Sequence, residues 1–305
     1  MSPLAPTRIG PRTFAWGERT FVMGILNVTP DSFSGDGLLQ LGHAVESALY
    51  AGRQMVAAGA DLLDVGGEST RPGGTVLTVD EERERVVPVL RGLRAAFPDL
   101  PLSIDTIKPG IAEAALDAGA DLLNDVWGVR DDLAMLRVAA ARGVPIVLMH
   151  NRSQPVYRNV VAEVVDDLWR ALDRARSAGI PDDHVIVDPG IGFGKTADQN
   201  LEVLARLEAL RALGRPLLLG TSRKSTLGRL LDLPPDQRVE ATLATTALGI
   251  AAGVDIVRVH DVAANVRAAR TADAILRGWR PMGWTDAAPP GPTGVLPTEP
   301  PAEVT

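Results

Sequence analysis

The sequence predicts one α/β domain, a (β/α)8 TIM barrel with a short N-terminal hairpin and a disordered C-terminal tail. Three observations carry this prediction. Short apolar runs alternate with helical stretches, a helix–glycine–strand unit recurs, and a polar side chain follows each apolar run. Alternating strands and helices indicate βα units around a parallel sheet.

Eight apolar runs are too short for helices and rich in branched aliphatic residues, which is typical of buried parallel strands. They lie at residues 21–26, 62–65, 102–104, 122–123, 146–149, 185–187, 217–219 and 256–259.

The recurring unit is clearest at residues 58–63 and 118–123, which both read AGADLL, and at 252–257, which read AGVDIV. Residues 142–144 and 178–180 are looser copies. In each copy we expect the glycine to end a helix in the left-handed conformation, with a strand following at once.

The alternative to a barrel is an open, doubly wound sheet. Functional residues of an open sheet cluster at one switch point, whereas the eight strand ends of a barrel meet at one mouth. The barrel is favoured because polar residues stand at or just past every predicted strand end: Asn27, Asp64, Asp105, Asn124, His150, Asp188, the 221–225 segment, and Arg258 with His260.

The two ends of the chain differ from its middle. We expect an extension at 1–20 with a hairpin over 12–20, the barrel at 21–280, and a Pro-rich tail at 281–305. From residue 286 the tail has no hydrophobic periodicity, which predicts disorder.

The composition excludes several classes of function. The 305 residues are 46% hydrophobic and 23% charged, as expected of a globular protein with a large core. The absence of cysteine excludes a thiolate metal site and a cysteine nucleophile, and it fits a reducing cytoplasm. A net charge of -7 without a Lys/Arg run argues against nucleic acid as a partner, and no apolar stretch is long enough to span a membrane.

Two loops are candidate ligand sites. Asn27, which opens the loop after the first strand, could offer a carbonyl oxygen to Mg²⁺, although an Asx turn is the commoner fate of such an Asn. After the second strand, Gly66 and Gly67 allow close approach of a ligand, and Thr70 with Arg71 suits a phosphate oxygen. A glycine-rich turn with a solvated Arg71 is the alternative for this second loop.

Three polar side chains at strand ends suit a heterocycle. Asp105 and Asn124 can together meet the donors and acceptors of a ring edge, and Asp188 adds a second carboxylate across the mouth. Residues 188–196 resemble a phosphate-binding P-loop, but Pro189 occupies the position of its first glycine. We interpret this segment as a glycine-rich turn that presents Phe193 as an apolar wall.

The last two strands predict an anion site. The 219–225 turn combines free amides with Arg223 and Lys224, where barrels often bind phosphate. Arg258 and His260 are two residues apart on a strand and so share a face, which makes them paired donors for a diphosphate. The alternative for His260 is a core histidine bonded to Asp261.

These segments, in this order, resemble the dihydropteroate synthase family. The matching pieces, from about residue 21 to about residue 278, read MGILNVTPDSFS, DVGGESTRPG, SIDT, NDV, LMH, DPGIGFGK, TSRKS and RVHDV. The resemblance implies a role in folate synthesis, Mg²⁺ dependence and a homodimer. It also implies a reaction in which p-aminobenzoate displaces diphosphate from a dihydropterin, with no covalent enzyme intermediate.

The resemblance implies three groups of site residues, with Arg258, His260 and Lys224 as the catalytic ones. The pterin would contact Asp105, Asn124, Met149, Asp188, Gly220 and Lys224. The diphosphate would contact Asn27, Thr70, Arg258 and His260, with Mg²⁺ near Asn27. The p-aminobenzoate would contact Arg71, Pro72, Phe193 and Ser225.

Two departures from the family pattern stand out. Residues 151–153 read Asn-Arg-Ser where many relatives have Met-Gln-Gly, and the first loop is one residue longer before Asp36, which leaves the role of Asp36 open. Two rival functions are a pterin-dependent methyltransferase domain and a non-catalytic pterin-binding paralogue. The 221–225 segment argues against the first, and the completeness of the motifs argues against the second.

Overall fold

The computed structural model describes residues 4–28, 41–68 and 77–285. Its strands are β1 (Thr7–Ile9), β2 (Arg12–Phe14), β3 (Phe21–Asn27), β4 (Leu62–Gly66), β5 (Leu102–Asp105), β6 (Leu122–Asp125), β7 (Ile146–Met149), β8 (Val185–Asp188), β9 (Leu218–Leu219) and β10 (Ile256–Val259). Its α-helices are α2 (Leu41–Ala57), α3 (Val79–Ala96), α4 (Pro109–Asp117), α5 (Ala134–Arg142), α6 (Val160–Ser177), α7 (Ala197–Ala205), α8 (Ser225–Leu231), α9 (Val239–Ala251) and α10 (Val262–Leu276).

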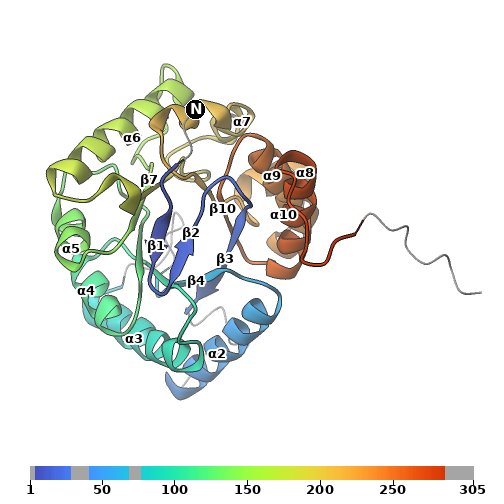
Figure 1. Ribbon diagram of the computed structural model, residues 1–305. Helices are drawn as coiled ribbons and strands as arrows, with labels where there is room; N and C mark the ends of the chain where they lie inside the picture. The colour runs from blue at the N-terminus through green and yellow to red at the C-terminus, as the bar shows by residue number, and fades with distance from the viewer. Residues whose placement is uncertain (1–3, 29–40, 69–76, 286–305) are drawn as a thin grey trace, which may run out of the picture.

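Strands β3 to β10 form one parallel sheet in the order β8-β7-β6-β5-β4-β3-β10-β9. A parallel bridge between Val187 of β8 and Leu217, just before β9, closes this sheet into a barrel. Figure 1 shows the helices as a ring around the strands. The predicted (β/α)8 barrel is therefore confirmed. None of the helices in the described segments combines the length and apolar composition that crossing a bilayer requires.

All eight predicted strands are present, with small differences at their ends. Five of them extend one or two residues further than predicted, to Asn27, Gly66, Asp105, Asp125 and Asp188. These residues are polar or glycine, so apolar patterning alone places the strand end too early. Strand β9 is instead shorter, because Leu217 pairs only in the closing bridge.

The recurring glycines end helices as the sequence predicts. Gly59, Gly119, Gly143, Gly179 and Gly253 all have positive φ, between 62° and 107°. A side chain at these positions would be strained, so glycine sets the point where each helix turns back to the next strand.

The aspartate of the same unit also has a structural role. The carboxylates of Asp61, Asp121 and Asp255 accept backbone N–H bonds from Val22, Leu102 and Leu217, at 2.8, 3.0 and 3.1 Å. Each therefore ties the start of its own strand to a neighbouring strand. These hydrogen bonds fix the register of neighbouring strands at the end of the barrel opposite the mouth.

The lower half of the barrel interior is apolar. It is filled by one inward side chain from each barrel strand except β5, and the N-terminal hairpin covers it from below. The residues of this apolar layer are Met23, Leu62, Leu122, Val147, Ile186, Leu218 and Ile256, with Ile9, Phe14, Trp16 and Phe21 beneath them. In Figure 1 the hairpin lies across the centre of the strand ring.

The hairpin starts earlier than predicted. Thr7–Ile9 pairs with Arg12–Phe14, and Gly10 turns the chain with φ of 55°. The segment up to residue 20 instead supplies Trp16, whose ring stacks on Phe14 at 5.7 Å between centroids. The sequence pattern alone could not distinguish the residues that pair in the hairpin from the aromatic residues that pack beneath the barrel.

Candidate active site

The mouth of the barrel is lined by residues that lie two positions after the apolar layer. Because side chains alternate along a strand, Asp64 follows Leu62 on the inner face, Asn124 follows Leu122, and Arg258 follows Ile256. One strand thus contributes to both layers, and the polar layer forms the open end.

An ion-paired cluster occupies one side of this mouth. Arg258 donates from Nε to Asp64 Oδ2 and from Nη2 to Asp105 Oδ2, both at 2.6 Å. Asn124 Nδ2 donates to the same oxygen of Asp64 at 2.9 Å. Burial raises the pKa of the Asp105 carboxyl, and the charge of Arg258 opposes this rise. The cation is what allows two carboxylates to share a buried site.

The cluster retains acceptors that the described residues leave without a hydrogen-bond partner. They are Asp64 Oδ1, Asp105 Oδ1 and Ser103 Oγ, all buried. A buried oxygen without a donor is costly, so these atoms are suited to a ligand that brings N–H groups. Asp64 was not among the predicted binding residues. Its position two residues after Leu62, which matches Asn124 after Leu122, is the signal that identifies it.

Asp188 and Lys224 converge from the opposite side. A Cβ placed on Gly220 would lie 3.8 Å from Lys224 Nζ, 3.9 Å from Arg258 Cβ and 4.0 Å from Asp188 Oδ2. Gly220 therefore marks the point where three predicted site residues meet. Met149 is the register partner of Asp188 on β7. Burial raises the pKa of the Asp188 carboxyl, while Lys224 and an N–H bond from Gly190 oppose the rise.

The glycine-rich turn after β8 presents Phe193 as expected. Lys224 Nζ lies 4.6 Å from the centroid of the Phe193 ring and also donates to the carbonyl of Ile191. An ammonium group over an aromatic face is attracted by the ring. Lys224 thereby connects the apolar wall to the carboxylate side of the mouth.

The turn before α8 differs from the prediction in its charge. Arg223 forms a bidentate ion pair with Asp261, with Nε 2.9 Å from Oδ2. Its backbone N–H donates to Thr242 Oγ1 at 3.2 Å. One of the two expected cations is thus neutralised. Ser225 begins α8 and is exposed.

His260 lies beyond Arg258 at the end of β10. Its Nδ1 is 3.0 Å from Ser222 Oγ, and its backbone N–H donates to the same hydroxyl at 3.1 Å. Ser222 is therefore a further residue that fixes the imidazole. No sequence motif distinguished it from its neighbours in the 221–225 segment.

Asn27 ends β3 beside β4. Its Oδ1 would lie 3.6 Å from a Cβ on Gly66. Thr70, Arg71, Pro72 and Asp36 fall outside the described residues.

A second polar cluster, which sequence reasoning missed, lies beside the mouth between β7, β8 and α6. His150 contacts Lys195 through Nδ1 and Asp167 through Nε2, at 2.9 and 3.1 Å. Arg152, from the segment that departs from the family pattern, donates to Asp167 at 2.7 Å. The three contributing segments are far apart in sequence, so no local pattern reveals this cluster.

Comparison with known proteins agrees with this geometry. The family model described as pterin binding enzyme matches residues 23–260. A dihydropteroate synthase from Clostridium beijerinckii is 49% identical over 271 residues, which cover 88% of this chain and 99% of that protein.

Two solved structures extend the comparison to bound ligands. The dihydropteroate synthase of Xanthomonas albilineans with 4-aminobenzoic acid has a TM-score of 0.84 and 44% identity, covering 89% of this chain and 98% of that one. The Burkholderia cenocepacia enzyme complexed with 7,8-dihydropteroate has a TM-score of 0.80 and 40% identity, covering 90% and 98%. With a family model across most of its barrel and near-full-length relatives of this identity, the chain belongs to the dihydropteroate synthase family.

Proposed function

We propose that the barrel mouth joins 6-hydroxymethyl-7,8-dihydropterin diphosphate to p-aminobenzoate, giving 7,8-dihydropteroate and diphosphate. As a member of its family the chain is a transferase of folate biosynthesis. The lone pair of the arylamine nitrogen attacks the methylene carbon of the pterin. The carbon–oxygen bond to diphosphate breaks, and the nitrogen then loses a proton.

The observation that carries this proposal is the buried cluster of Asp64, Asp105, Asn124 and Arg258. Its unpartnered carboxylate oxygens match the N–H groups along the edge of a pterin ring. Asp188, on the far side, supplies a further acceptor. A ring held by carboxylates also gains favourable electrostatics as positive charge develops on the methylene carbon.

The leaving diphosphate is assigned to Arg258 and His260, with Thr70 from the loop after β4. Arg258 has two roles in this scheme, because it also forms ion pairs with Asp64 and Asp105. Its charge serves the ring-binding carboxylates and the departing anion together. Stabilising that anion lowers the barrier without an enzyme nucleophile.

The arylamine is assigned to the other side of the mouth. Phe193 would pack along its ring, and its further contacts are assigned to Arg71, Pro72 and Ser225. Lys224 stands between this site and the pterin, since its ammonium group faces the Phe193 ring and approaches Gly220. A fixed approach of the two reactants accounts for much of the rate gain in such a substitution.

We propose Mg²⁺ as the cofactor, with Asn27 as a protein ligand. Among the described residues no group of three His, Cys, Asp or Glu side chains could hold a metal ion. A single carboxamide oxygen fits Mg²⁺ that is otherwise held by water and by substrate phosphate oxygens. When bound there, the ion neutralises part of the diphosphate charge. Asn27→Ala should raise the Mg²⁺ concentration needed for half-maximal turnover.

A turnover assay with both substrates tests the function. The synthase releases diphosphate only when p-aminobenzoate is present and forms dihydropteroate in equal amount. A non-catalytic pterin-binding paralogue would bind the pterin without releasing diphosphate. The methyltransferase alternative would bind a pterin and gain nothing from p-aminobenzoate. Either result would overturn the proposal.

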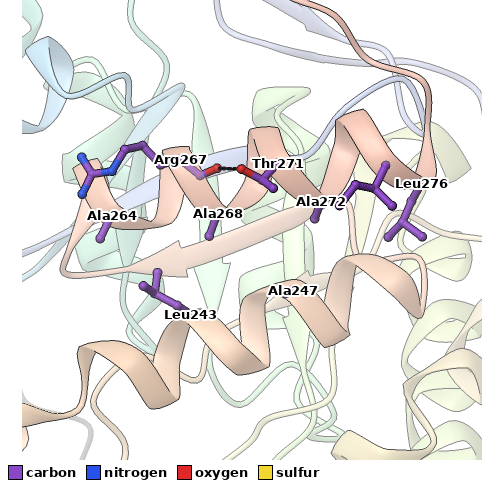
Figure 2. Close-up of a pocket in the computed structure, with 9 residues that line it drawn as sticks. Leu243, Ala247, Ala264, Arg267, Ala268, Thr271, Ala272 and Leu276 are labelled. Atoms are coloured by element: carbon purple, nitrogen blue, oxygen red, sulfur yellow. Dashed lines mark hydrogen bonds between the residues drawn. The ribbon is translucent and has the colours of Figure 1, made fainter.

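We further propose that the chain works in the cytoplasm as a homodimer that uses the outer face of α9 and α10. Figure 2 shows the groove between these helices, lined by alanines and by Leu243 and Leu276. Its volume is about 490 Å³. Leu248 and Ile275, on the same helices, are 68% and 76% exposed. Exposed apolar groups around an apolar groove are typical of an interface between subunits.

Light scattering with the variant Ile275→Glu tests this interface. The charged side chain should convert the dimer to a monomer, because its burial in an apolar contact is costly. Tyr50→Glu, at a position 66% exposed on α2, is the matched control and should leave the mass unchanged. A monomeric wild-type protein would contradict the proposal.

A further inference from the structure

The sequence contains only three lysines, Lys108, Lys195 and Lys224, against 28 arginines. Lys195 has no part in the reaction scheme above, yet its ammonium group is enclosed. Nζ donates to the carbonyls of Gly190 and Phe193 at 3.0 and 3.2 Å and contacts His150 Nδ1 at 2.9 Å. Three acceptors match the three N–H donors of a protonated lysine.

Two of these acceptors belong to the turn that presents Phe193. Within the turn, Phe193 N–H donates to Gly190 O at 3.1 Å, and Gly190 N–H donates to Asp188 Oδ1 at 2.7 Å. Gly190 has φ of 68°, and a Cβ there would lie 1.8 Å from the carbonyl oxygen of His150. The turn therefore packs closely against the end of β7, and Lys195 donates hydrogen bonds to two of its carbonyls.

The third acceptor connects the turn to α6. Although burial opposes it, hydrogen bonds from His150 and Arg152 hold the pKa of Asp167 at about 2, so Asp167 is an acceptor. Burial lowers the pKa of His150 to about 4, so its imidazole is neutral. His150 must then carry its proton on Nε2, facing Asp167, and offer the Nδ1 lone pair to Lys195.

We propose that Lys195 is a positioning residue for the arylamine site, which holds the Phe193 turn against the His150–Asp167 pair and so fixes the wall on which p-aminobenzoate packs. This inference rests on the proposed function of the mouth. Lys195 touches neither substrate in this scheme. It acts through Phe193, which faces Lys224, and through Gly190, which contacts Asp188.

The same geometry makes the turn sensitive to pH. The charged and titratable groups that face Lys195 are His150, Asp167, Arg152, Asp188 and Lys224. Burial, with help from Lys224 and Arg152, lowers the pKa of Lys195 to about 7, against the opposite effect of Asp188 and Asp167. Above that pH a neutral amine has two N–H donors for three acceptors, and its lone pair faces one of them. The turn should then loosen.

Steady-state kinetics of Lys195→Met test the proposal. We expect the KM for p-aminobenzoate to rise about tenfold, the loss of roughly one charged hydrogen bond, while kcat changes less than about threefold. In the wild type this KM should rise between about pH 6 and pH 8.5, and in the variant it should not depend on pH. The control Arg206→Met, which removes an exposed ion pair with Glu202 of α7, should behave as wild type. If Lys195 only stabilised the fold, Lys195→Met would lower the melting temperature, and the KM of the variant would depend on pH as it does in the wild type.

A second measurement needs neither a folded variant nor turnover. With ¹³Cε-lysine labelling, the wild-type protein gives three side-chain signals, one for each lysine. The signal of Lys195 should titrate with a midpoint near neutrality. Amide exchange of residues 190–196, corrected for intrinsic pH dependence, should rise across the same midpoint. Three lysines that all titrate above about pH 10, or exchange that stays constant, would overturn the proposal. If labelling shows the neutral midpoint but no dihydropteroate forms, the proposed function fails and the role of Lys195 in the turn stands.

Discussion

The two layers inside the barrel lie on the same strands, only two residues apart, and they differ completely in chemistry. Leu62, Leu122 and Ile256 fill the lower layer, whereas Asp64, Asn124 and Arg258 form the mouth. The lower layer is closed by the hairpin and can only contribute stability. The mouth retains buried carboxylate oxygens that receive no hydrogen bond from the described residues, which is unfavourable until a ligand arrives. The apolar layer thus supports, above it, a layer of buried polar atoms that is suited to a ligand.

The largest expected effect lies just beneath the apolar layer, in the hairpin that closes it. Phe14 is 1% exposed and packs on Trp16 and Phe21, so Phe14→Ala should lower the free energy of unfolding by about 3–5 kcal/mol. Its distance from the mouth should keep kcat/KM per folded molecule within about twofold of wild type. Urea denaturation and active-site-normalised kinetics measure the two quantities. A large loss of kcat/KM in the folded variant would break the separation of layers.

Arg258→Ala should have the next largest effect, and it belongs to the mouth. Binding of the dihydropterin diphosphate should weaken by about 2–5 kcal/mol, the range for truncating one partner of a buried charge pair. Because Asp64 and Asp105 also lose their cation, a pterin without diphosphate should weaken as well. Calorimetry with both ligands distinguishes this from a residue that contacts diphosphate alone. The exposed Arg91 supplies a control, Arg91→Ala, with no change expected for either ligand.

The smallest of these effects is a pH dependence of pterin binding. Burial raises the pKa of Asp105, so its protonation begins well above the ordinary range of an aspartate. If the ring donates to the ionised carboxylate, affinity should rise by up to about a hundredfold from pH 5 to pH 8, and Asp105→Asn should abolish this rise. The folded state holds this proton more tightly than the unfolded chain does, so the same titration lowers the free energy of unfolding as pH rises. An unchanged slope in Asp105→Asn would assign the dependence to another group.

The pattern of apolar runs, glycines and polar strand ends explains how much of the fold and of the candidate site could be predicted from the sequence. Residues such as those at 146–149 and 256–259 define strands by composition alone, and the glycines at 59, 119 and 253 fix the helix ends, so the barrel follows from local sequence. The mouth was predicted where a polar residue directly follows an apolar run, as at Asn124 and Asp188.

Other features depend on contacts that no local pattern records. The pairing of Arg223 with Asp261 spans 38 positions, and that of Arg258 with Asp64 spans 194. The sequence showed Lys195 only within a failed phosphate-loop motif and the family piece DPGIGFGK. Its role could not be predicted, because its three acceptors come from the loops after two different strands. Long-range electrostatics, rather than secondary structure, was the part that the sequence left undetermined.

Strand β8 provides the most direct test of the two layers, because Ile186 and Asp188 lie on its inner face in the lower layer and at the mouth. Ile186→Ala should lower the free energy of unfolding by about 2–5 kcal/mol and leave kcat/KM per folded molecule nearly unchanged. Asp188→Asn keeps an acceptor for the Gly190 N–H bond and should change stability by no more than about 1 kcal/mol. Its loss of the carboxylate should reduce kcat/KM by at least about a hundredfold. Normal turnover by Asp188→Asn, or an equal loss of kcat/KM in Ile186→Ala and Asp188→Asn, would contradict the division of the barrel into a stabilising layer and a binding layer.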